Sequence, residues 1–134
     1  MDIAIIGTGN MARGIASRLV AGGHSVRLLG TQAQKAEAVA DELSGDVRAG
    51  KSNTTFAGTL AEGTVAGQPL GVFLASDDDD AKATVGQLVG DGGLRPVDAG
   101  PLRRARELEA LGYLHMAIQQ PLGTGFGSAV KVVS

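Results

Sequence analysis

Hydrophobic and polar positions in the opening part of the chain alternate between short apolar runs and one longer amphipathic segment. Residues 3–6 form an Ile-rich run that ends at Gly7, and so short a run predicts a buried parallel strand rather than a helix. In residues 10–21 apolar side chains recur about every 3.6 positions, which predicts a helix that ends at Gly22-Gly23. Residues 25–29 return to a strand pattern. The opening therefore predicts a strand, a tight turn, a helix and a second strand.

The same alternation resumes further along the chain. An Ala-rich helix is expected over residues 32–43, and residues 44–68 predict a mostly irregular segment with a short helix near 56–60. The later elements expected are a strand over 70–75, a helix from the Asp77–Asp80 run to Asp91-Gly92-Gly93, a strand over 94–98, and a helix from Gly100-Pro101 to about Ala117. Together they predict an α/β, Rossmann-like fold with a mostly parallel sheet, helices on both faces and about four strands. We expect residues 1–134 to form one domain.

Composition narrows the class of protein. The 134 residues are 43% hydrophobic and 19% charged with a formal net charge of −2, values typical of a soluble globular domain. The apolar runs are shorter than a membrane span, so we expect a cytoplasmic protein with no membrane partner. Few aromatic residues and no dense basic stripe argue against a nucleic-acid partner. The absence of cysteine excludes disulfides, thiol nucleophiles and thiolate metal sites.

The stretch GTGNMA, residues 7–12, carries the clearest chemistry. It is a G-x-G-x-x-A pattern placed directly between a predicted strand and a predicted helix. Gly7 suits the tight turn, Gly9 lets backbone approach a pyrophosphate, and Ala12 permits close packing of helix on strand. Free N–H groups and the positive end of the helix dipole then hold the diphosphate. The alternative is a purely structural turn, since glycine is frequent in this chain.

The end of the second predicted strand indicates which dinucleotide binds. Sites for NAD usually place an acid there to bind the ribose 2′-OH, but the stretch LLGTQAQK, residues 28–35, contains none. Thr31 can donate a hydrogen bond to a 2′-phosphate and Lys35 can neutralise its charge. These residues favour NADP over NAD. Thr31 could also serve as the cap of the following helix.

Three separated stretches resemble one family. They are residues 3–30 (IAIIGTGNMARGIASRLVAGGHSVRLLG), residues 53–60 (NTTFAGTL) and residues 97–119 (VDAGPLRRARELEALGYLHMAIQ). In this order they resemble the NADPH-dependent coenzyme F420 reductases, the F420-dependent NADP oxidoreductase family. The resemblance implies reversible hydride transfer between NADPH and the deazaflavin coenzyme F420 on a Rossmann-type fold, usually in a homodimer. It places Thr8, Gly9, Asn10 and Met11 at the NADP diphosphate and Thr31 at the position of the 2′-phosphate serine.

The middle of the chain is shorter than the resemblance leads one to expect. In that family several strands and helices precede a segment like KAFNTT, whereas here KSNTT, residues 51–55, follows the second predicted helix almost at once. The segments that flank the nicotinamide are therefore expected to be largely missing. Their loss would leave sheet edges exposed, which predicts a homodimer that rebuilds a continuous sheet.

Alternative functions and sites follow from the same residues. A non-catalytic nucleotide-binding or dimerising remnant, or an NADP-dependent imine or keto reductase, are the two other functions considered, and no side chain is predicted to be catalytic. Asp77–Asp80 suit a helix cap and its first turn better than a metal site. Arg103, Arg104 and Arg106 could receive the anionic tail of F420, but a solvated helix face with an Arg103–Glu107 ion pair is the commoner arrangement.

Three further features are expected to be structural. His24 and His115 stand without a serine elbow, a cysteine or a paired metal motif, which indicates packing or surface histidines. The Gly-rich residues 121–128 do not lead from a strand into a clear helix, so we expect them to belong to a packed tail.

Overall fold

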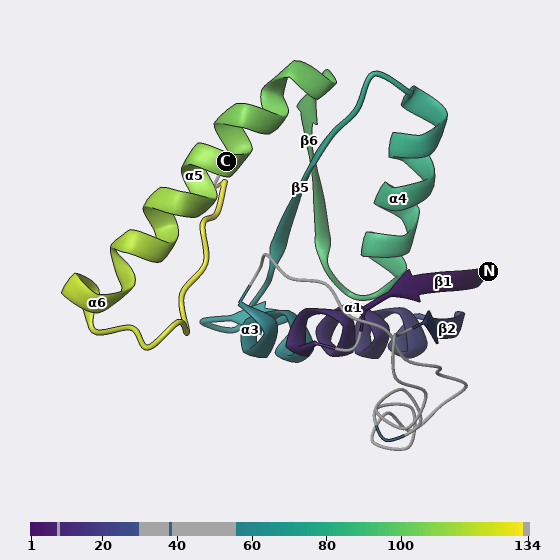
Figure 1. Cartoon of the computed structure of the whole chain (residues 1–134), viewed down its shortest axis with the longest axis horizontal. Helices are drawn as coiled ribbons and strands as arrows, with labels where there is room; N and C mark the ends of the chain where they lie inside the picture. Colours follow the sequence, from purple (N-terminus) through teal and green to yellow (C-terminus); the bar gives the residue numbers. More distant parts are fainter. Residues whose placement is uncertain (8, 30–37, 39–55, 133–134) are drawn as a thin grey trace.

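The structure is a computed structural model of the 134-residue chain and describes residues 1–7, 9–29, 38 and 56–132 (Figure 1). Its strands are β1 (Asp2–Ile6), β2 (Ser25–Leu29), β3 (Thr64–Val65), β4 (Gln68–Pro69), β5 (Gly71–Ala75) and β6 (Arg95–Gly100). Its helices are α1 (Asn10–Ala21), α3 (Ala57–Glu62), α4 (Asp79–Asp91), α5 (Ala105–Ala117) and α6 (Gln119–Leu122), with a 3₁₀ turn η1 (Leu102–Arg104) before α5. The helix predicted over residues 32–43 lies outside the described part of the chain except at residue 38, which is helical.

The first unit is β1–α1–β2, as the opening pattern predicts. Strands β1 and β2 are parallel, with Ile6 in register with Leu29. Side chains alternate in exposure along both strands, so one face of the pair packs against α1 and the other faces solvent. The buried members of this first core are Ala12, Ala16 and Leu19 of α1 with Val26 and Leu28 of β2. Helix α1 thus covers one face of the pair, which places its N-terminus beside the end of β1.

The second unit is β5–α4–β6, again a parallel pair joined by a helix. The pairing runs from Gly71 opposite Arg95 to Ala75 opposite Gly100, with an irregularity between Leu74 and Ala75. The acidic run acts as the helix start that the sequence predicts, because an Asp78 carboxylate oxygen accepts a hydrogen bond from the Ala81 N–H at 2.9 Å. Figure 1 shows α4 on one side of this pair and α5 on the other.

The α/β, Rossmann-like prediction is confirmed, and all four predicted strands form. The described strands are arranged as separate two-stranded sheets, β1–β2, β3–β4 and β5–β6, rather than as one four-stranded sheet. The segment expected to be mostly irregular also contains more order than predicted in its described part. There α3 is followed by the short antiparallel hairpin β3–β4, whose turn places Ala66 and Gly67 at positive φ.

Helix α1 holds the two units together. Its N-terminal residue Met11 belongs to a second core with Leu60 of α3, Leu70 and Leu94, while its later residues belong to the first. Ile15 packs against both cores. One helix therefore supplies apolar side chains to both halves of the molecule.

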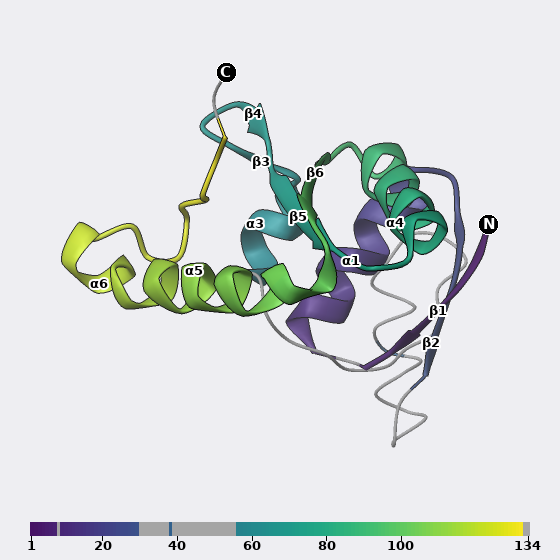
Figure 2. The same cartoon turned by 90° about the horizontal axis from the view of Figure 1, so that it is seen from above.

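The C-terminal part extends away from the two units (Figure 2). Helix α5 contains no buried residue, and after α6 the chain turns back along it. The tail is fixed by Gln119, only 2% exposed, whose side-chain oxygen Oε1 accepts hydrogen bonds from the Thr124 and Ser128 hydroxyls. The Gln119 amide in turn donates to the His115 carbonyl at 2.7 Å. These bonds confirm that the Gly-rich segment belongs to a packed tail.

Candidate cofactor site

The turn between β1 and α1 is described at Gly7 and Gly9, on either side of residue 8. Gly7 is buried, has φ 145°, and donates its N–H to the Leu29 carbonyl at 3.0 Å. Only glycine adopts this φ readily, so the first glycine of the pattern is needed for the turn itself. The bond to Leu29 also places the end of β2 directly beside the turn.

Gly9 is a different case from Gly7. It is the N-cap of α1 with φ −83° and ψ 175°, an extended conformation that any residue adopts. Its conformation therefore gives no reason for glycine at this position. In the dinucleotide-binding pattern, glycine at this position lets a ligand approach the backbone.

The N-terminus of α1 is open to an anion. Among the described residues no side chain caps it, and its first turn contains no acid. Its first intrahelical hydrogen bond is that of the Arg13 N–H to the Gly9 carbonyl, so the preceding N–H groups have no partner within the helix. These N–H groups and the helix dipole both favour a negatively charged ligand.

The next residues of the pattern divide between site and core. Ala12 is fully buried against the first core, as the packing role predicted for it requires. The Met11 side chain packs into the second core, so only its backbone can contribute to the site. Asn10 is exposed at the first position of the helix. Thr8, Thr31 and Lys35 lie outside the described residues.

An open groove of about 310 Å³ begins beside the turn and runs between α1 and α3. Helix α3 approaches closely because Gly14 has no side chain: a Cβ there would lie 3.1 Å from the Ala57 carbonyl oxygen. The sequence analysis missed this groove, because the position of α3 against α1 is a tertiary feature. Arg13, a basic residue near the start of α1, is among the residues that line it. The groove is lined by Asn10, Arg13, Gly14, Ser17, Ala57, Gly58 and Ala61.

Comparison with known families decides the identity. Residues 2–91 match the family model described as NADP oxidoreductase, coenzyme F420-dependent. The chain belongs to this family. The match covers β1 through α4 and so includes the glycine turn. A search of curated proteins finds no match.

Membership of the F420-dependent NADP oxidoreductase family identifies the fold as that of an NADP-binding oxidoreductase, with a nicotinamide cofactor. In that fold ligands lie at the carboxyl ends of the parallel strands. The glycine turn lies at that end of β1, and Leu29 lies at that end of β2. The described residues of the predicted site, Gly7 and 9–12, therefore lie at the carboxyl end of β1.

The carboxyl ends of β5 and β6 carry a second polar cluster. The Lys82 ammonium lies 3.2 Å from an Asp79 oxygen and 3.3 Å from an Asp98 oxygen. The hydrogen bond to Asp79 is the largest of the influences that raise the Lys82 pKa above 10.5. The Gly100 N–H donates to Asp98 at 2.7 Å, and this bond, followed by the one from Lys82, lowers the pKa of Asp98 below 3.8. The cluster links the start of α4 to the end of β6, and its charged groups pair with one another.

Two of the three arginines considered for the anionic tail of F420, Arg104 and Arg106, form ion pairs with Glu107. Glu107 pairs with Arg104 at 3.7 Å and with Arg106 at 3.5 Å. The predicted Arg103–Glu107 ion pair is therefore wrong, and the neighbouring Arg104 takes the place of Arg103. The cause is the 3₁₀ turn that ends at Arg104, which changes the spacing assumed for a continuous helix.

Both histidines also contact structural partners. The His24 imidazole lies 3.1 Å from an Asp91 oxygen at the end of α4. His115 lies 2.9 Å from the Ser128 hydroxyl and its ring lies 4.9 Å from that of Phe56. The prediction that these are packing histidines is confirmed by these contacts.

Within the described residues, no helix is both long enough and apolar enough to cross a membrane, and no group of three or more His, Asp or Glu side chains is placed to hold a metal ion.

Proposed function

We propose that this protein binds NADP at the glycine turn and transfers hydride between NADPH and the deazaflavin coenzyme F420. The observation that carries the proposal is Gly9, a glycine in an ordinary extended conformation at the uncapped, acid-free start of α1. A glycine whose conformation does not need it, at a helix start that favours anions, is what close approach of a diphosphate requires.

The residues assigned to the cofactor follow from the turn and from the sequence. Gly7, Thr8, Gly9, Asn10, Met11 and Ala12 are assigned to the diphosphate, with Met11 acting through its backbone and Ala12 through close packing. Thr31 and Lys35 are assigned to the 2′-phosphate. The proximity of Leu29 to Gly7 supports this second assignment, because it starts the Gly30–Lys35 segment beside the turn.

The reaction needs no catalytic side chain. NADP and F420 supply the hydride donor and acceptor when bound, so the chain contributes binding and orientation. Holding two reactants in the correct geometry is worth up to about 7–11 kcal/mol in well-oriented systems. The rigid part of this contribution is the turn, which is fixed by the Gly7–Leu29 hydrogen bond and by packing of Ala12.

One observation favours a second candidate, nucleotide binding without turnover. The two parallel pairs form separate sheets in the described residues, so β1 and β5 do not present a continuous row of strand ends. A platform for the second cofactor would then depend on another chain. Assembly as a homodimer is accordingly part of our proposal, and a cytoplasmic location stays a prediction.

The test is a titration of purified protein with NADPH and, separately, with NADH. Cofactor fluorescence gives the dissociation constants, and melting temperature reports native-state binding, which stabilises by about 2.7 kcal/mol at a hundredfold excess over Kd. We expect tighter binding of NADPH than of NADH. Absorbance then measures whether NADPH reduces F420, which distinguishes an active oxidoreductase from a nucleotide-binding protein without turnover. Absence of binding to either nucleotide would overturn the assignment of the turn.

A further inference from the structure

Helix α3 forms one wall of the groove beside the glycine turn, yet it has few means of holding its own position. It contains six residues, and within the described part of the chain no side chain caps its start. A helix this short is marginal in water without tertiary packing. On the side of α1, Gly14 only limits how closely α3 can approach. The position of this wall therefore depends on contacts with other parts of the chain.

Phe56, which immediately precedes α3, is held by two aromatic rings from the C-terminal part of the chain. Its ring centroid lies 4.9 Å from that of His115 in α5 and 4.9 Å from that of Phe126 in the tail, the second pair being edge to face. The Phe56 carbonyl accepts hydrogen bonds from the Leu60 N–H at 3.1 Å and from the Thr59 hydroxyl at 2.8 Å. Phe56 thus connects the first turn of α3 to α5 and to the tail.

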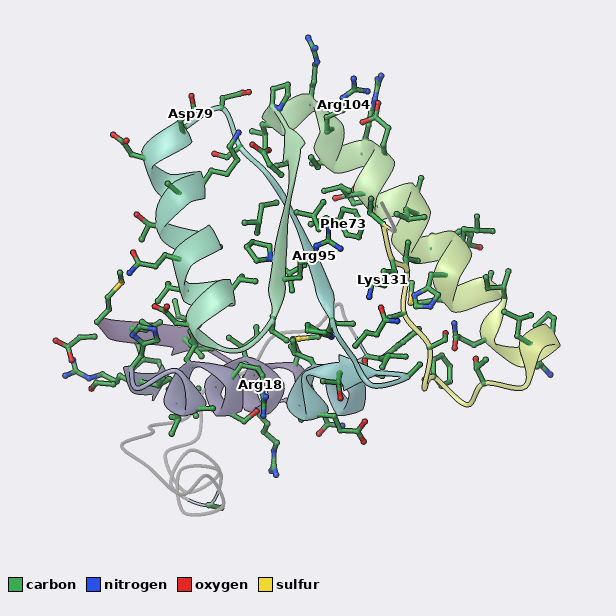
Figure 3. The ribbon with its side chains drawn as sticks, turned by 180° about the vertical axis from the view of Figure 1, so that it is seen from behind. Arg18, Phe73, Asp79, Arg95, Arg104 and Lys131 are labelled. Carbon is green, nitrogen blue, oxygen red and sulfur yellow. The ribbon has the colours of Figure 1, made fainter. Side chains whose placement is uncertain are left out.

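The tail contacts the same region a second time, through the second core. Ala129 packs against this core, which contains Leu60 of α3 and Met11 of α1. Further along the tail, the Val132 carbonyl accepts a hydrogen bond from the Arg95 guanidinium of β6 at 3.1 Å. Figure 3 shows the tail running back from α6 toward the β5–β6 pair. The tail therefore packs on the core that supports both α3 and the start of α1.

We infer that His115 and Phe126 are positioning residues that hold α3, and through it the groove beside the cofactor turn. Neither residue lines the groove, so both act through Phe56. Both also lie beyond residues 2–91, the part of the chain that matches the family model. The consequence for the cofactor rests on the proposed function: a displaced α3 changes the space beside the glycine turn, so NADPH should bind less tightly.

Phe126→Ala tests this role, because it removes one of the two rings from a position that is already 54% exposed. The backbone at Phe126 has φ 65°, and alanine adds no strain to that conformation. Phe126→Tyr keeps the ring and is the conservative variant. Tyr113→Ala is the matched control, because it removes a ring of α5 that is 73% exposed.

The first measurement is hydrogen exchange of the protein without nucleotide. Phe126→Ala should exchange faster than the parent over residues 58–62 of α3, whereas Phe126→Tyr and Tyr113→Ala should exchange as the parent does. Unchanged exchange of α3 in Phe126→Ala would overturn the inference. An equal acceleration in α4 would also overturn it, because it would show a general loss of stability instead of a local release of α3.

The second measurement is a fluorescence titration with NADPH. Phe126→Ala should raise the Kd for NADPH about two- to tenfold, the size expected for the loss of one aromatic pair. Phe126→Tyr should restore the affinity, and Tyr113→Ala should leave it unchanged. If the parent binds NADPH and Phe126→Ala binds it equally well, the inferred role at the groove is wrong. If the parent binds no NADPH, the proposed function is wrong instead, and the exchange of α3 still decides whether these rings position the helix.

Discussion

Gly22 lies against the backbone of Asp91, so closely that a Cβ atom at position 22 would be 2.7 Å from the Asp91 carbonyl carbon. The contact is matched in the other direction, because a Cβ at Gly92 would be 3.0 Å from the Arg18 Cβ. Helices α1 and α4 therefore meet at their C-terminal ends through two glycines. Both have φ near −75° (−80° and −72°), so packing rather than conformation requires them. Their neighbours Gly23 and Gly93 have φ angles of 76° and 75°, so the backbone conformation favours glycine at these two positions.

Substitution of Gly22 tests this crossing. Gly22→Ala should lower the free energy of unfolding by roughly 1–3 kcal/mol, because the atoms that a new Cβ meets are backbone and cannot rotate away. Urea unfolding followed by circular dichroism measures the change. Gly90→Ala is the matched control on α4: no atom lies within 4 Å of the added Cβ, and helix propensity predicts a gain of about 0.5–1 kcal/mol. Equal effects of the two substitutions would contradict close packing at Gly22.

Substitution of Gly9 separates the site from the fold. Gly9→Ala keeps an allowed backbone conformation, so the apoprotein should lose at most about 1 kcal/mol, from poorer N-cap preference. The added Cβ should nevertheless weaken NADPH binding at least about tenfold, equivalent to ~1.4 kcal/mol. Fluorescence titration of Gly9→Ala beside Gly90→Ala measures the difference. Unchanged affinity would mean that the diphosphate does not approach position 9.

The Asp98 carboxylate gives the protein a pH dependence in acid. Its pKa is lowered in the folded state, chiefly by the Gly100 N–H, so it stabilises the fold above its ordinary value of 3.8 and this contribution is lost as pH falls through the lowered pKa. Asp98→Asn keeps an acceptor for Gly100 but loses the charge. We expect the variant to be slightly less stable at neutral pH, with a difference from the parent that vanishes at low pH. Urea midpoints from about pH 2.5 to 7 measure it.

Asp98→Asn should also change the stability of the fold at alkaline pH, because Asp98 is a partner of Lys82. Its pKa is raised above 10.5, so its contribution is fully present below that value and is lost as pH rises through the raised one. Asp98→Asn removes one of its two carboxylate partners, leaving Asp79. Glu109→Gln, which removes an exposed acid from α5, is the control and should leave the acid and alkaline profiles parallel to those of the parent.

Gln119 should control the order of the C-terminal tail. Gln119→Leu removes the acceptor for Thr124 and Ser128 and the donor to His115, and leaves these partners without their bonds in a partly buried region. A cost of about 1–3 kcal/mol is expected for such groups. Hydrogen exchange should show faster exchange over residues 123–132. Gln120→Leu, at the exposed neighbouring position, should leave that exchange unchanged.

The sequence predicted the first unit closely. The bounds of α1 agree with the predicted 10–21, because an amphipathic period, a glycine turn before it and Gly22-Gly23 after it all indicate the same helix. The glycine pairs were predicted only as helix ends. Their contact across the molecule could not be predicted, because α1 and α4 are separated by many residues and the pattern of one helix says nothing about which other helix it crosses.

The arrangement of the strands was the harder part. Apolar runs predicted the bounds of β5 and β6 within a residue or two. Whether two strand pairs join into one sheet depends on hydrogen bonds between their edge strands, and the sequence of a single strand does not indicate which strand it will pair with. The β3–β4 hairpin was missed because its strands have two residues each, and its turn carries Ala66 where Asn or Gly would have been a signal. At the site, the turn was predictable from local sequence, whereas the groove beside α3 depended on packing.

The double membership of α1 in the two cores has a consequence for how the chain comes apart. Met11 and Leu19 lie on the same helix, and each packs in a different core. If one core unfolds, the helix loses contacts that hold the other core together. In the described residues, no hydrogen bonds between strands join the β1–β2 pair to the β5–β6 pair, but packing on α1 couples the unfolding of the two pairs. Heat should therefore unfold both units in a single cooperative transition.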